Sequence, residues 1–228
     1  MRQLVFLIDL DNTLLDNDGV KEDMKATLGD ILGERLAKEF WRLYEVVRDD
    51  LDVIDFYETM RRLAEENPKD ADLVQTALDA LMEWDFCPRL YPQAIEVIEH
   101  LKTMGTPIVL SDGDPVFQPS KIHQCGVTQA VEGRVLIFVH KEKFLPSVRA
   151  RFKADHYVLV DDKPGILLRS KAALGDRLTT VHVLQGKYAL DPKHAVDYKP
   201  DIVIQRIDEL LKCGKEDFLL KAKEAAGV

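Results

Sequence analysis

Charged and hydroxyl side chains follow four short apolar segments of this sequence, and their chemical types fit one another. They are Asp9 and Asp11 after residues 4–8, Ser111 after 107–110, Lys141 and Lys143 after 135–139, and Asp161 and Asp162 after 157–160. Carboxylates gathered in one place repel one another unless a cation lies between them, and hard oxygen ligands suit Mg²⁺. A lysine and a hydroxyl beside them suit a phosphoryl group, whose charged oxygens need compensation in the transition state. These residue types therefore indicate phosphoryl chemistry at a Mg²⁺ site, provided that the chain brings them together.

The apolar segments are predicted to be the strands that bring these side chains together. Each is a nearly continuous apolar run, as in strands buried on both faces, and two weaker runs follow at 180–184 and 202–204. Helical patterns separate the runs, and strands that alternate with helices pair in parallel through right-handed crossovers. We therefore expect an α/β fold with a three-layer, Rossmann-like open parallel sheet. Ligands of such sheets bind beyond the carboxyl ends of the strands, where the sequence places the polar side chains.

One long segment after the first strand breaks this alternation. From about residue 17 to residue 86 there is no convincing strand pattern, only three amphipathic helical patterns over 20–49, 53–66 and 71–84. A helical segment of this length is best explained as a small second domain carried on two linkers. We therefore expect a Rossmann-like core domain formed by residues 1–16 and 87–228, and an all-helical domain formed by residues 17–86.

Composition excludes several classes of function. The 228 residues carry 31 Lys and Arg against 40 Asp and Glu, a formal net charge of −9, and the basic residues form no stripe for a nucleic-acid backbone. The first apolar run is too short for a signal peptide, and none approaches the roughly 18 to 20 apolar residues of a membrane-spanning helix. Cys87, Cys125 and Cys213 lack metal-ligand spacing, which favours free thiols in a reducing compartment. We expect a soluble cytoplasmic protein, monomeric or homodimeric, that binds neither nucleic acid nor membrane.

The order of the polar motifs resembles that of a known enzyme superfamily. The segment Asp9-Leu10-Asp11-Asn12-Thr13, then Ser111, then Lys141 or Lys143, and then Asp161-Asp162 are similar to the four signatures of the haloacid dehalogenase superfamily. The helical segment falls where that superfamily places its helical cap, so the resemblance covers nearly the whole chain. It implies a hydrolase whose cap selects the substrate.

The resemblance also implies a catalytic role for each motif residue. Asp9 would be the nucleophile that attacks phosphorus and forms an aspartyl-phosphate. Asp11 would protonate the leaving oxygen and later activate water. Ser111 would donate a hydrogen bond to a phosphoryl oxygen, and Lys141 would neutralise charge on both the phosphate and Asp9. The family often shows Lys followed by Pro here, and this chain has no such pair there, so the lysine is chosen by position: Lys141 is closest to the strand end, and Lys143 is the alternative.

Metal and substrate contacts follow from the same resemblance. The cofactor that it implies is Mg²⁺, held by Asp9, Asp11 through its backbone carbonyl, Asp161 and Asp162. We expect further contacts with the substrate from Asp112, Gly113 and Lys143.

Asp11 also decides between branches of the superfamily. The dehalogenases of this superfamily lack an acid at this position, because a halide needs no proton to leave. The sequence therefore predicts a Mg²⁺-dependent phosphatase that acts on a small phosphorylated metabolite. Three alternatives stay open: a phosphotransferase or phosphomutase of the same fold, a non-catalytic binding protein that retains the scaffold, and a dehalogenase.

Overall fold

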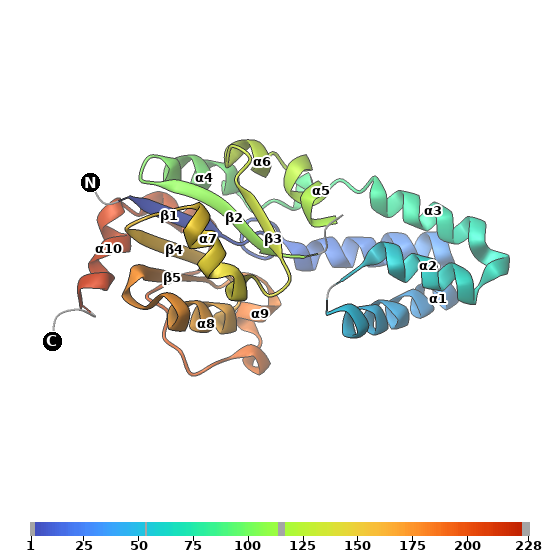
Figure 1. Cartoon of the computed structure of the whole chain (residues 1–228). Helices are drawn as coiled ribbons and strands as arrows, with labels where there is room; N and C mark the ends of the chain where they lie inside the picture. The colour runs from blue at the N-terminus through green and yellow to red at the C-terminus, as the bar shows by residue number, and fades with distance from the viewer. Residues whose placement is uncertain (1–2, 53, 114–116, 225–228) are drawn as a thin grey trace.

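A parallel sheet forms the centre of the protein, as a computed structural model shows (Figure 1). The structure describes residues 3–52, 54–113 and 117–224. Within them, the strands are β1 (Leu4–Ile8), β2 (Thr106–Asp112), β3 (Val135–Phe138), β4 (His156–Asp161), β5 (Leu178–Val183) and β6 (Ile202–Ile204). Neighbouring strands all pair in parallel, in the order β3-β2-β1-β4-β5-β6. The predicted open parallel sheet is confirmed, and β1 lies between β2 and β4.

Helices cover both faces of the sheet, because the side chains of each strand alternate between two cores. In β1, Leu4, Phe6 and Ile8 belong to one core, whereas Val5 and Leu7 belong to the other. The first core is covered by α4 (Ala94–Lys102), α5 (Phe117–Gln124), α6 (Val127–Ala130) and α10 (Lys215–Glu224), and the second by α7 (Leu145–Arg151) and α8 (Pro164–Leu174). The three-layer, Rossmann-like architecture is therefore confirmed.

Short helices fill the connections between these elements. They are α9 (Gly186–Leu190) and the 3₁₀ helices η1 (Pro68–Asp70), η2 (Cys87–Arg89), η3 (Lys141–Phe144), η4 (Gly175–Arg177), η5 (Pro192–His194) and η6 (Ile207–Lys212). Pro119 lies in the first turn of α5, where the missing N–H has no partner within the helix and proline is tolerated. Among the helices that the structure describes, none combines the length and apolar character needed to cross a membrane.

Three helices follow β1 and form what we call the helical insertion, residues 17–82. They are α1 (Asn17–Leu51), α2 (Phe56–Glu66) and α3 (Ala71–Met82), and they lie together beyond the carboxyl end of β1 (Figure 1). Their shared interior buries Phe40, Met60, Leu63 and Leu81. The helical pattern begins at Val53, which lies outside the described residues. The helix itself begins at Phe56, because the Asp55 carboxylate accepts a hydrogen bond from the Glu58 N–H at 2.8 Å.

Polar contacts fix the start of α1 to the chain that returns to the core. Asp16 caps α1 by accepting a hydrogen bond from the Gly19 N–H at 2.9 Å. Arg89, on η2, forms an ion pair with Asp23 at 2.6 Å and lies 3.4 Å from Asp16. Both chain connections of the helical insertion therefore meet at one place, while its boundaries as a separate domain at residues 16 and 86 stay a prediction.

Candidate active site

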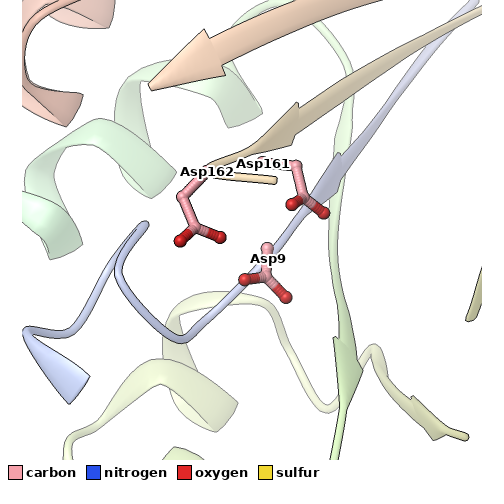
Figure 2. Close-up of side chains that lie close together, drawn as sticks. All are labelled: Asp9, Asp161 and Asp162. Carbon is pink, nitrogen blue, oxygen red and sulfur yellow. The ribbon is translucent and has the colours of Figure 1, made fainter. Parts of the chain in front are cut away.

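Three buried carboxylates meet at the carboxyl ends of two neighbouring strands. Asp9 directly follows β1, Asp161 is the last residue of β4, and Asp162 follows it. Because β1 and β4 pair in parallel, their ends place these side chains together, as Figure 2 shows. One carboxylate oxygen from each lies within 4.8 Å of the others, and each residue is at most 2 % exposed. The sequence predicts that these three residues lie together, and in the structure they do.

Lys141 is the lysine that reaches this cluster. It is 1 % exposed, and its ammonium contacts the Asp9 carboxylate, lies 2.7 Å from Asp161 Oδ2 and donates to the Leu110 carbonyl at 3.1 Å. Its backbone N–H donates to Asp112 Oδ1 at 2.7 Å, which fixes the start of η3 against β2. Burial alone would lower the pKa of Lys141, but Asp161 and Asp9 outweigh it and the pKa is raised.

Lys143, the alternative lysine, is not brought to the site. Its side chain is exposed, and it does not line the cavity described below. The reason is the 3₁₀ turn of η3: two residues at three per turn place Lys143 on a different side of the helix from Lys141. Lys141 therefore takes the position beside Asp9, and the expected contact of Lys143 with the substrate stays a prediction.

The acidic cluster has the properties of a divalent cation site. Within the described residues, Asp9 Oδ2 and both carboxylate oxygens of Asp162 accept no hydrogen bond, although all three are buried. Burial raises the pKa of Asp9 to about 7, with Lys141 opposing it. Burial together with Asp161 and Asp9 raises the pKa of Asp162 to about 9. Buried carboxylates without partners are costly, and an all-oxygen set of this kind fits Mg²⁺.

Asp11 and Ser111 are held by side chains of α5. Asp11 forms an ion pair with Lys121 at 2.8 Å and accepts a hydrogen bond from Gln118 at 3.3 Å. Gln118 also donates to Ser111 Oγ at 2.9 Å. Burial acts to raise the pKa of Asp11, but the Lys121 ammonium outweighs it and the pKa is lowered. The Asp11 carboxylate is thus turned toward α5, and the predicted metal contact of this residue rests on its backbone carbonyl alone.

The structure adds three residues that the sequence prediction did not assign to the site: Gln118, Lys121 and Lys163. The backbone N–H of Lys163 donates to Asp161 Oδ1 at 2.8 Å. Burial acts to lower the pKa of the Lys163 ammonium, but Asp9 and the other carboxylates raise it to about 12. Lys163 follows the acidic pair directly in the sequence, which was a usable signal. Nothing in the sequence marked Gln118 and Lys121 in this way, because their burial depends on where α5 packs.

A cavity of about 520 Å³ opens between the helical insertion and the part of the core that carries the strand ends and α5. On the core side it is lined by Asp11, Asn12, Phe86, Asp112, Gly113, Phe117, Gln118, Lys121, Val139, His140, Lys163 and Tyr188. On the side of the helical insertion it is lined by Asn17, Val20, Lys21, Met24, Arg48, Asp49, Asp52, Ile54 and Phe56. Asp112 and Gly113, predicted to contact the substrate, both line the cavity. The cavity is large enough for a small organic molecule.

Comparison with known proteins identifies the family. The family model of haloacid dehalogenase-like hydrolases matches residues 4–183. The chain belongs to this family. A solved haloacid dehalogenase-like hydrolase of Burkholderia xenovorans LB400 is 41 % identical, with 95 % of this chain and 99 % of that chain covered and a TM-score of 0.87. The suspected superfamily and an enzymatic role are therefore confirmed. No protein with a curated function matches the sequence.

More distant hydrolases of the family share the fold. One, from Xanthomonas campestris, is 16 % identical with a TM-score of 0.67, over 98 % of this chain and 94 % of that chain. An L-2-haloacid dehalogenase from Xanthobacter autotrophicus, with chloropropionic acid covalently bound, is 15 % identical with a TM-score of 0.58. That match covers 93 % of this chain and 98 % of the dehalogenase. Identities this low show a shared fold and leave the reaction to be argued from the site.

Proposed function

We propose that this haloacid dehalogenase-like hydrolase is a Mg²⁺-dependent phosphatase that acts on a small phosphorylated metabolite. The observation that carries the proposal is a pair of carboxylates: Asp9 is buried against Lys141, and Asp11 lines the cavity. A phosphate ester needs a nucleophile and a proton donor for its leaving oxygen, whereas a halide leaves without a proton. Two carboxylates in these positions therefore favour ester hydrolysis over carbon–halogen cleavage.

In the proposed reaction the phosphoryl group passes through Asp9. A carboxylate oxygen of Asp9 attacks phosphorus, and the bond from phosphorus to the ester oxygen breaks. Asp11 has to leave its ion pair with Lys121 and take up a proton before this step, and it then gives that proton to the ester oxygen. The product then leaves as an alcohol. Asp11 next takes a proton from water, whose oxygen attacks the same phosphorus. The bond between phosphorus and Asp9 breaks, which releases inorganic phosphate and restores the carboxylate.

Several groups would balance the negative charge of the phosphoryl oxygens. Lys141 lies beside Asp9, and the Lys163 ammonium is close enough to act on the pKa of Asp9. The Ser111 hydroxyl, near the end of β2, accepts a hydrogen bond from Gln118, which fixes its position. Mg²⁺, held by Asp9, the backbone carbonyl of Asp11, Asp161 and Asp162, would add positive charge against the same oxygens.

The helical insertion would act as the cap that selects the substrate. It supplies one wall of the cavity, so the part of the substrate beyond the phosphate would lie against α1 and α2. We also propose that the protein works in the cytoplasm on a small-molecule substrate, as a monomer or homodimer. Closure of a cap over such a site would exclude water from the first step.

Hydrolysis of 4-nitrophenyl phosphate tests the proposal directly. Wild type should turn over only with Mg²⁺, and Asp9→Asn should lose at least about 10³-fold in rate because the nucleophile is gone. Asp11→Asn should lose a similar factor for lack of a proton donor. Lys141→Met should lose most turnover. Lys143→Met is the matched variant, and its exposed side chain predicts a rate close to wild type.

Other outcomes would point to other functions. Turnover that survives Asp9→Asn would contradict the mechanism. Chloride release from 2-chloropropionate without phosphate release would favour a dehalogenase. A requirement for a bisphosphate would favour a phosphomutase, and binding of phosphate esters by wild type without turnover would favour a binding protein.

A further inference from the structure

The cavity is much larger than a phosphate group and has an apolar body. Beyond the carboxylates and lysines of the strand ends, its wall carries Val20 and Met24 of α1, Phe56 of α2, and Phe86 and Phe117 of the core. This lining fits the carbon skeleton of a substrate. A polar group on that skeleton would have to find its partner among the remaining charged residues of the wall.

Most charged side chains of the wall already have a partner. Lys121 pairs with Asp11 at 2.8 Å, Arg48 pairs with Glu45 at 2.6 Å, and the ring of His140 contacts Asp52 at 2.5 Å. Side chains engaged in this way offer less to a ligand, because a ligand would have to displace the existing partner.

Two lysines of the wall, Lys163 and Lys21, have no ion-pair partner among the described residues. Lys163 directly follows the acidic pair and is assigned to the phosphate above, which leaves Lys21. Within the described part of the chain no carboxylate lies within 4.0 Å of its ammonium, and its only specific contact there is with the ring of Tyr44, at 5.9 Å from the centroid. The side chain is half-buried on the second turn of α1. Burial and the neighbouring Lys187 and Lys121 ammonium groups lower its pKa, with Asp11 opposing them. The positive charge at Lys21 is therefore under-compensated, and an anion would relieve it.

We propose that Lys21 binds a carboxylate of the substrate, so that the substrate class is phosphate monoesters whose apolar body carries a carboxylate. The inference rests on the proposed function of the same site. On the side of the helical insertion, one unpaired ammonium matches a singly charged group, and Asp49 and Asp52 in the same wall disfavour a more highly charged one. Lys21 would thus determine specificity, while Asp9 carries the chemistry.

Matched esters with and without a carboxylate test this assignment. The pairs are phenyl phosphate with 4-carboxyphenyl phosphate, and propyl phosphate with 3-phosphonooxypropanoate. In wild type, kcat/KM should be at least about 10-fold higher for the carboxylate member of at least one pair, which is the effect of one charge-assisted contact. In Lys21→Met the ratio should fall to about 1, and Lys21→Arg should retain much of it.

Lys25→Met is the matched control, because Lys25 is exposed one turn further along α1 and does not line the cavity. It should keep the wild-type ratio. If Lys21→Met slows both members of a pair equally, Lys21 serves the phosphate and the proposal is wrong. It is also wrong if wild type hydrolyses both members equally.

Binding without turnover separates this proposal from the proposed function. Titration calorimetry of wild type and Lys21→Met with the four esters, in the absence of Mg²⁺, reports Kd directly. Tighter binding of a carboxylate ester that depends on Lys21 supports the subsite even if no ester is hydrolysed, in which case the phosphatase proposal alone fails. Binding without that preference, or no binding of any ester, overturns the subsite whatever the turnover.

Discussion

Lys121 is a buried cation that contacts residues of the candidate site. It is 7 % exposed, pairs with Asp11 at 2.8 Å and donates to the Asn17 side chain at 2.9 Å. Replacing it with methionine leaves the half-buried Asp11 carboxylate without its charged partner. We expect Lys121→Met to lower the free energy of unfolding at neutral pH by about 2 kcal/mol, as for other hydrogen bonds to charged groups. Urea unfolding measures this.

The pH dependence gives this prediction its sign. Lys121 holds the pKa of Asp11 below its unfolded value, so the stabilisation is present above that value, about 3.9, and is lost as pH falls through the folded pKa. The difference between wild type and Lys121→Met should therefore shrink below about pH 4. Lys38→Met, at an exposed position of α1, should change little. A difference that is independent of pH would contradict the ion pair as its cause.

The acidic cluster should couple Mg²⁺ binding to pH. The folded protein raises the pKa of Asp9 to about 7 and of Asp162 to about 9, above the unfolded values. The contribution of these two protonated carboxyl groups to the free energy of unfolding is complete below about pH 4. It is lost as the groups ionise, when the pH rises through about 7 for Asp9 and about 9 for Asp162. Mg²⁺ should therefore raise the Tm more at about pH 8.5 than at about pH 6, because at lower pH it competes with protons.

Thermal unfolding with and without millimolar Mg²⁺ at the two pH values measures this coupling. Calorimetry in two buffers of different ionisation enthalpy should show proton release on binding. Asp162→Asn removes the carboxylate with the higher pKa and should weaken both effects. An equal rise in Tm at both pH values in wild type would count against the cluster as the Mg²⁺ site.

At the scale of elements, replacing either of two glycines of α1 with alanine should change the free energy of unfolding in opposite directions. Gly33 sits at a kink with φ 70° and ψ 167°, a conformation that only glycine adopts readily, whereas Gly29 is helical. An added Cβ meets nothing within 4 Å at either position, so the backbone alone decides. Gly33→Ala should cost about 1 to 2 kcal/mol of unfolding free energy, and Gly29→Ala should add up to about 1 kcal/mol. Similar effects of both substitutions, in urea unfolding, would show that the kink is not fixed.

The strands and the helical insertion could be predicted because their signals are local. Apolar runs mark buried strands, and periodic stripes mark the insertion's helices. The kink in α1 could not be predicted, since the stripe continues past Gly33 and nothing in the sequence separates it from Gly29. The bounds of β2 and β4 also differ from the predicted runs, because the pairing of backbone groups extends the strands through Asp112 and Asp161.

The same distinction applies to the candidate site. Residues at strand ends, such as Asp9 and Asp161, could be placed together because strand order alone brings them to one edge. Lys121 could not, because its position depends on how α5 folds back over the end of β2. The sequence already favoured Lys141 over Lys143, and the turn of η3, which a strand pattern does not encode, explains why Lys143 lies away from Asp9.

At the scale of the whole molecule, the cavity exists only while the helical insertion lies over the strand ends. The chain connections hold its base through Arg89 and Asp23. Across the cavity, Asp52 at the end of α1 contacts His140, the residue before Lys141. This contact joins the far part of α1 to the loop that carries the site lysine.

Breaking that contact should open the cavity without unfolding either part. The Asp52–His140 pair is exposed, so it is worth up to about 1 kcal/mol, and Asp52→Asn should raise the open population by up to about five-fold. Spin labels at Lys69→Cys and Arg151→Cys, with the native cysteines replaced, report the distance between the two parts. High salt should move wild type toward the Asp52→Asn distribution.

Asp50→Asn is the matched control, because Asp50 lies on the same turn but pairs with Arg62 inside the helical insertion at 2.7 Å. It also removes an exposed charge, without touching the core, so the label distances should stay as in wild type. If Asp50→Asn and Asp52→Asn shift the distances alike, the effect comes from the net charge of α1 and not from the contact with His140. If neither shifts them, the contacts of Arg89 at the base are enough to hold the helical insertion over the strand ends.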